Sequence, residues 1–99
     1  MDIVKNEYIS DLLMIYGDLL TDKQKDYFTD YYLENLSLSE IEENFNVSRN
    51  AVFKQIKEAE NKLRFYEDNL NLLKNSIKIS KLLENIKDER IKEEIEKLI

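Results

Sequence analysis

The chain of 99 residues contains no His and no Cys, which narrows the chemistry that its side chains can perform. Without Cys there is no disulfide and no thiolate metal ligand, and without His the commonest general base and metal ligand are missing. The acidic pairs Glu42–Glu43 and Glu93–Glu94 suggest a paired-carboxylate site at first sight. Neighbouring residues on a helix diverge by about 100°, however, so neither pair converges on one ion or one substrate. We therefore expect no catalytic site, no bound metal and no cofactor.

Charge is distributed unevenly within the net value of −6. Residues 1–47 carry 3 positive and 11 negative side chains, residues 48–66 carry 5 and 2, and residues 67–99 carry 7 and 8. Arg suits guanine edges and Asn suits adenine edges, whereas Lys contacts phosphates. The basic segment therefore supplies the candidate nucleic-acid contacts, which are Ser48, Arg49, Asn50, Phe53, Lys54 and Lys57. The alternative is a solvated helix face, on which Phe53 either meets a partner or folds onto the tail.

The segment Leu38–Lys57 fits a helix-turn-helix. Five apolar positions would fix the crossing of its two helices, namely Ile41, Phe45, Val47, Val52 and Ile56. Asn46 takes the bend position, where Asn tolerates left-handed backbone better than most residues. Glu42 stands where a small residue is expected, so it must point outward or the crossing angle must open. With Val52 and Ile56 inside, the candidate contacts of the second helix point mostly outward.

Capping signals mark the helices that surround this motif. Apolar residues at helical spacing predict a helix over 3–17, closed by Gly17. Thr21 with Gln24 is a capping-box pattern that begins a helix of about 22–35. The same pattern begins a short helix of about 38–45, and Ser48 is a further cap candidate. The inner side of the second helix would be aromatic, with Tyr27, Phe28, Tyr31 and Tyr32 in the core rather than stacked on bases.

The back half of the chain is predicted to be helical as well. Apolar residues from Val52 to Ile77 alternate in spacings of four and three, which is typical of a seam between helices. Poor helix formers at Asp68–Asn71 are expected to interrupt it, and Asp88 can cap a last helix. We predict an all-α fold of five to six helices, with a helix-turn-helix domain over 1–70. Residues 71–99 form a helical tail that packs on this domain or on a second chain.

Several motifs in this order resemble a known family. The run LLTDKQKDYFTDYYLENLSLSEIEENFNVSRNAVFKQIKEAENKL, residues 19–63, is similar to the YlxM family (UPF0122), small helix-turn-helix proteins of low-GC bacteria. Their front half is similar to region 4 of sigma factors. The likeness covers roughly residues 6–68, whereas the tail after Leu70 matches in character only. It implies a protein that is not an enzyme and that takes part in the signal recognition particle pathway, with regulation through DNA binding as the other suggestion.

Three functional hypotheses follow. The first is a regulator that binds DNA or RNA, working as a homodimer that reads two half-sites about one DNA turn apart. The second is a protein-interaction module that contacts the GTPase of the signal recognition particle through the acidic front half. The third is a sigma-like or anti-sigma protein that contacts RNA polymerase.

The sequence has no apolar run of the roughly 20 residues that span a bilayer and no signal-peptide pattern, so we expect a cytoplasmic protein.

Overall fold

A computed structural model describes residues 3–99 of the chain, with side chains from Glu7 onward. This part of the chain is all-helical and contains no strand, which confirms the predicted fold class. Six α-helices and one short 3-10 turn follow one another: α1 Ile3–Tyr16, η1 Gly17–Leu19, α2 Asp22–Tyr32, α3 Leu38–Phe45, α4 Arg49–Leu70, α5 Leu72–Leu83 and α6 Glu89–Glu96.

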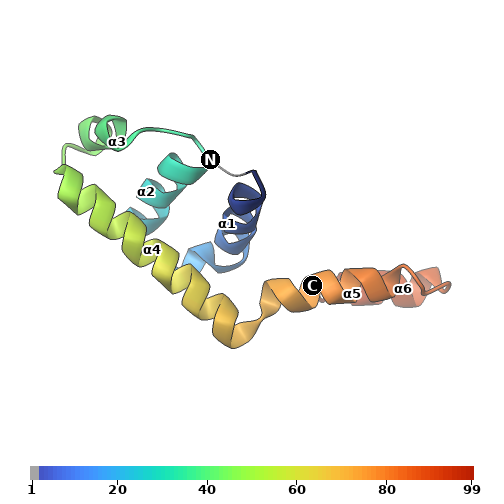
Figure 1. Ribbon diagram of the computed structural model, residues 1–99. Helices are drawn as coiled ribbons and strands as arrows, with labels where there is room; N and C mark the ends of the chain where they lie inside the picture. Colours follow the sequence, from blue (N-terminus) through green and yellow to red (C-terminus); the bar gives the residue numbers. More distant parts are fainter. Residues whose placement is uncertain (1–2) are drawn as a thin grey trace.

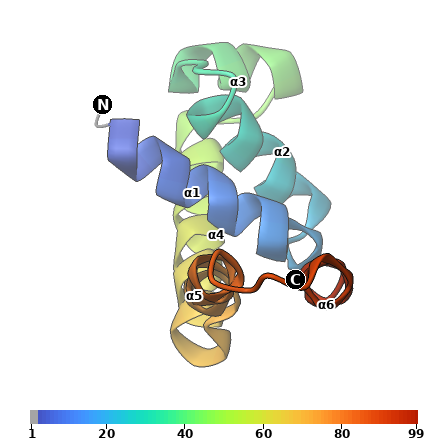
Figure 2. The ribbon, with the colours of Figure 1, turned by 90° about the vertical axis from the view of Figure 1, so that its right-hand side faces the viewer.

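The long helix α4 is the element on which the helices before it pack (Figure 1). Helices α1, α2 and α3 pack along one side of it, and α5 leaves its far end at an angle. Helix α6 returns beside α5, so that residues 72–99 form a helical hairpin that projects from the body (Figures 1 and 2). The extents are 55 × 24 × 19 Å and the radius of gyration is 16.8 Å, against about 13 Å for a compact chain of this length. We call residues 72–99 the arm.

The core lies between α4 and the three helices on its inner side. The predicted apolar stripe is buried along α4 at Val52, Ile56, Ala59 and Leu63. The aromatic face of α2 also lies where it was predicted, with Tyr27 and Phe28 buried and Tyr31 and Tyr32 partly buried against the core. Helix α1 contributes Ile9, Leu12, Leu13 and Tyr16, and α3 contributes Ile41. The seam along α4 is therefore covered by the chain's own helices.

Side-chain caps fix the helix starts at the predicted places. Thr21 and Gln24 form a reciprocal capping box at α2, and Ser37 and Glu40 form another at α3. The Ser48 hydroxyl accepts the Ala51 N–H at 3.2 Å and so begins α4 without an acidic partner. The Asp88 carboxylate accepts two N–H groups at the start of α6. Each such cap contributes about 1 kcal/mol to stability.

Three Asn residues that follow the ends of helices have a left-handed backbone conformation. Asn46 has φ 52° and ψ 50° in the bend of the helix-turn-helix, as predicted. Asn35 and Asn71 have φ values of 56° and 55°. Because the chain turns at Asn35, α2 ends at Tyr32, three residues before the predicted end. Helix α1 does end immediately before Gly17, but this glycine does not have a positive φ.

The turn at Asn71 separates α4 from α5 and changes which residues face inward. Leu73 is buried, whereas Leu70 and Ile77 are about half exposed. The predicted interruption at Asp68–Asn71 is therefore confirmed, and of the seam positions Leu70, Leu73 and Ile77 only Leu73 stays buried. A positive φ at Asn71 rotates the next helix out of register with α4.

A buried polar junction holds the start of α5 against α1 and α4. The Tyr16 hydroxyl donates to Glu67 Oε1 at 2.7 Å and accepts the Leu72 N–H at 3.2 Å. The two Glu67 carboxylate oxygens accept the N–H groups of Leu73 and Lys74, both at 3.0 Å. The first three N–H groups of α5 are thus satisfied by side chains of α1 and α4, because Asn71 supplies no side-chain cap.

The helix-turn-helix crossing carries one unfavourable feature. Glu42 is half-buried, and its Oε1 atom is buried without a hydrogen-bond partner among the described residues. The carboxylate is therefore neither fully outside the crossing nor paired within it. Phe45 is 38% exposed but lies against Tyr27 with ring centroids 4.7 Å apart.

Candidate nucleic-acid interface

The start of α4 lies beside α3, at the end of the molecule opposite the arm (Figure 1). Ser48 sets the first turn, and the burial of Val52 and Ile56 fixes the rotation of the helix about its axis. Among the described elements, none covers the side of α4 that faces away from α1 and α2 (Figure 1). The six residues predicted to contact nucleic acid are all exposed: Ser48, Arg49, Asn50, Phe53, Lys54 and Lys57.

These six residues divide into two groups by their position around the helix. Asn50, Lys54 and Lys57 lie within about 60° of one another on the outer face of α4. Phe53 lies on the flank that faces α2 and α3, where it borders a pocket with Tyr31 and Leu38, and Arg49 lies about 40° from Phe53 around the helix. The Ser48 hydroxyl accepts a hydrogen bond from the backbone of α4, so its first role is that of a cap.

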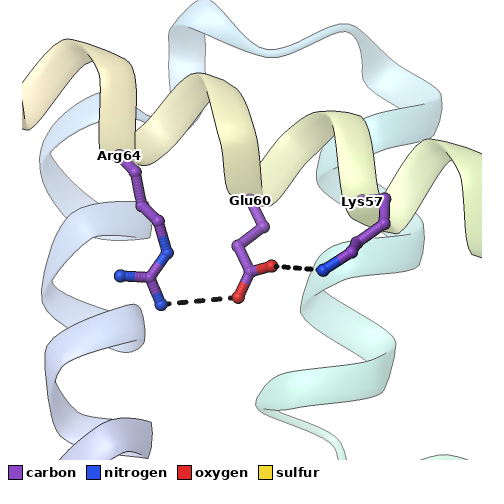
Figure 3. Close-up of polar contacts among 3 residues, drawn as sticks. All are labelled: Lys57, Glu60 and Arg64. Carbon is purple, nitrogen blue, oxygen red and sulfur yellow. Dashed lines mark hydrogen bonds and ion pairs between the residues drawn. The ribbon is translucent and has the colours of Figure 1, made fainter.

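The charges on this surface are not equally available. Lys57 Nζ lies 3.4 Å from Glu60 Oε2, and Arg64 approaches the other carboxylate oxygen of Glu60 at the same distance (Figure 3). The Glu60 side chain is only 12% exposed, so a nearly buried negative charge lies next to Lys57 on this surface. Within the described part of the chain, neither Arg49 nor Lys54 forms an ion pair. These two residues are therefore the free cations of the surface.

Glu60 also affects the aromatic side chains beside it. Burial raises the pKa of the Tyr32 hydroxyl, and the Glu60 charge raises it further. Tyr32, Tyr31 and Phe53 border a small pocket of about 150 Å³ between α2 and α4, with Lys57 and Glu60 at its edge. One side of Phe53 thus faces this pocket, although 53% of the residue remains accessible to solvent.

Carboxylates recur at intervals of four residues along α2 and the turn that follows it, and we call them the acidic row on α2. Asp22, Asp26 and Glu34 are exposed and Asp30 is half-buried. Burial raises the pKa of Asp30, and repulsion from Asp26 and Glu34 raises it further. The row is thus a real concentration of negative charge, on a different helix from the basic surface.

The sequence did not predict the roles of Gln24 and Glu60, whose side chains bind other side chains of α4. Gln24 is 3% exposed; its amide donates to Glu58 at 3.3 Å, and its oxygen accepts from Lys62 at 2.9 Å. Only the capping role of Gln24 could be predicted from its neighbours in sequence. Glu60 appeared as one more acidic residue on a charged helix. Its partners at positions 57 and 64 have the spacing of helical ion pairs, which is the signal that could have identified it.

Within the described residues, no three side chains of the types that bind metals come together. Among the helices described, none has both the length and the apolar character needed to cross a bilayer.

Fold and surface together define an all-α helix-turn-helix protein with the start of its second motif helix exposed. The chain belongs to the UPF0122 family, whose model, "Putative helix-turn-helix protein, YlxM / p13 like", matches residues 3–99. It is 52% identical over 75 residues to a UPF0122 protein of Pediococcus pentosaceus, which covers 76% of this chain and 66% of that one. UPF0122 proteins of Lactococcus lactis and Fusobacterium nucleatum are 43% and 44% identical, covering 87% and 92% of this chain and 78% and 88% of theirs.

Proposed function

We propose that this protein is a non-enzymatic regulator that binds DNA through the exposed start of α4. The observation that carries the proposal is the pair of unpaired cations Arg49 and Lys54, presented with Asn50 on the helix that follows the helix-turn-helix bend. In such motifs the first residues of the second helix reach base edges in the major groove. Arg49 and Asn50 would read bases, while Lys54 and Lys57 would contact phosphates. Ser48 and Phe53 complete the proposed site.

We place this regulator in the cytoplasm and in the signal recognition particle pathway, and we propose that it acts as a homodimer. The pathway assignment is supported by the family resemblance described above and not by any contact in the structure. A dimer is supported by the exposed apolar side chains of the arm. Residues 1–70 would then form the binding domain and residues 71–99 the tail that meets the second copy.

The test is an electrophoretic mobility shift at low salt with pooled genomic fragments and with the RNA of the particle. We expect binding to DNA that weakens steeply as salt rises, because neutralised phosphates release counterions. Arg49→Ala should weaken binding about tenfold, within the roughly 1–3 kcal/mol of a base contact, whereas Lys54→Ala should weaken binding to all sequences and reduce the salt slope by about 1. The control is Lys23→Ala, which removes an exposed charge on α2. Absence of a shift with DNA for the unaltered protein would overturn the proposal, whether or not the RNA is bound.

A second candidate function is supported by the acidic row on α2. Asp22, Asp26, Asp30 and Glu34 could attract a basic protein surface, such as one on the GTPase of the particle or on RNA polymerase. In this case the protein would act as an interaction module without binding DNA. Affinity capture with the tagged chain should then recover one of these proteins, and Asp26→Asn with Glu34→Gln should abolish recovery. Recovery of neither partner would remove this candidate.

A further inference from the structure

The arm exposes several large apolar side chains along its two helices. Only Leu73 and Leu83 are buried in residues 72–99. Six large apolar residues of the arm are about half exposed or more, namely Leu72, Ile77, Leu82, Ile91, Leu98 and Ile99. Scattered exposed apolar residues are ordinary, but a concentration on one projecting element marks an interaction surface.

The total surface area is larger than that of a compact chain of this mass. The chain exposes 7243 Å², whereas a compact monomer of its mass exposes about 5,900 Å². The excess is about 1,300 Å² for each chain. A standard stable interface buries about 800 Å² on each partner, which is less than this excess.

Charge favours a second copy of this chain as the occupant. Helix α5 carries three Lys residues and no acidic residue, whereas α6 carries four Glu residues against one Arg and one Lys. Two hairpins related by a two-fold axis, with α5 of each copy against α6 of the other, would therefore bring helices of opposite net charge together. Residues 1–70 are strongly acidic overall, so association of two bodies would be opposed by repulsion.

A groove at the base of the arm provides a place for apolar side chains to enter. It has a volume of about 480 Å³ and lies between the end of α1, the first turns of α5 and the last residues of the chain. Ile15, Leu72, Ile79, Leu98 and Ile99 border it. The hydrogen bonds of Tyr16 and Glu67 hold the start of α5 beside α1 and thereby fix the two sides of this groove relative to each other.

We propose that the arm is the dimerisation surface, and that the α5–α6 hairpins of two copies pack against each other with α5 facing α6 of the partner. This inference names the surface of the homodimer proposed above and rests on that part of the proposed function. It does not depend on nucleic-acid binding. An isologous contact of this kind closes on itself, so it produces a dimer and not a filament.

Sedimentation equilibrium of the full chain without nucleic acid tests the proposal. We expect twice the chain mass of 11.9 kDa for the unaltered protein and the chain mass for Leu82→Glu, with the helical content preserved. Leu82 is 66% exposed, so its replacement removes little from the fold of one chain. The matched control is Phe65→Glu, which adds the same charge at a residue 63% exposed on α4 and should remain dimeric.

The absence of native Cys allows a second measurement that needs no disruptive variant. Leu82→Cys should be joined to a second copy by a bifunctional maleimide, whereas Phe65→Cys should not. A monomeric unaltered protein would overturn the dimer itself. A dimer that persists in Leu82→Glu, with Phe65→Glu monomeric, would keep the dimer but overturn its assignment to the arm. A monomer that sediments with phosphatidylcholine vesicles would assign the same surface to lipid and also overturn the proposal.

Discussion

At the scale of single residues, Glu60 is the side chain that most limits the positive charge of the candidate interface. It lies between Lys57 and Arg64 and is largely shielded from water (Figure 3). A carboxylate in this position fixes two long basic side chains. It also cancels part of their charge toward a polyanion. The free cations Arg49 and Lys54 therefore carry most of the proposed contact.

Replacing Glu60 by Gln should strengthen DNA binding at low salt. Lys57 would then be free to contact a phosphate, and each added phosphate contact steepens the slope of log K against log salt by about 0.9. Fluorescence anisotropy across a salt series measures this slope. Glu84→Gln on the arm makes the same change of net charge far from the start of α4 and should leave the slope unchanged. Weaker binding by Glu60→Gln would show that the ion pairs position the contacts.

Glu42 is the other residue whose environment makes a clear prediction. Its buried Oε1 lacks a partner among the described residues, and such an atom costs about 1–3 kcal/mol when fully desolvated. Because Glu42 is only half-buried, we expect Glu42→Ala to increase the free energy of unfolding by up to about 1 kcal/mol. Urea unfolding followed by circular dichroism measures the change, with exposed Glu43→Ala as the control. A clear loss of stability would mean that Glu42 has a favourable role at the crossing.

At the scale of elements, the junction between α4 and α5 depends on a carboxylate held by hydrogen bonds. Burial alone would raise the pKa of Glu67. The hydrogen bonds from Tyr16 and from the N–H groups of Leu73 and Lys74 instead bring it below its ordinary value of 4.5. These bonds favour the charged form in the folded protein. We therefore expect the polar junction that holds α5 against α1 and α4 to weaken in acid.

The direction of this pH dependence follows from linkage. The folded-state pKa of Glu67 lies below that of the unfolded chain, so the unfolded chain binds the proton first as pH falls. The stabilisation is complete above about pH 4.5 and is lost as pH falls through the lowered pKa. Glu67→Gln should cost roughly 1–3 kcal/mol at pH 7, and the difference from the unaltered protein should shrink in acid. Exposed Asp68→Asn is the control, and a cost that is constant with pH would contradict the interpretation.

Local signals in the sequence predicted most of the elements but not the contacts between distant ones. The caps Thr21, Ser37, Ser48 and Asp88 act on residues two or three positions away, and all four were predicted correctly. Glu67 and Tyr16 are 51 residues apart, and no spacing rule connects them. The poor helix formers at Asp68–Asn71 predicted the interruption of the seam, but not that a left-handed Asn71 would leave Leu70 and Ile77 exposed. The exposure of the candidate contacts followed from the buried positions of α4, whereas the pairing of Lys57 with Glu60 needed the side-chain geometry.

At the scale of the whole molecule, the acidic front half and the basic start of α4 favour different partners. Net charge acts over about 8 Å at physiological ionic strength, so the acidic row on α2 reduces the attraction of DNA mainly at low salt. The same row would attract a basic protein. The two candidate functions thus respond in opposite directions to one change of charge.

Replacing Asp26, Asp30 and Glu34 by Asn, Asn and Gln tests this opposition. The net charge changes from −6 to −3, and the repulsion that raises the pKa of Asp30 is removed, so the fold should be at least as stable. If the protein is a DNA-binding regulator, the triple variant should bind DNA several-fold more tightly at low salt, and the gain should fade as salt rises. If it is an interaction module, the variant should lose its protein partner while DNA binding stays absent. Equal affinity of the variant and the unaltered protein for DNA at low salt would show that the field of α2 does not reach the bound nucleic acid.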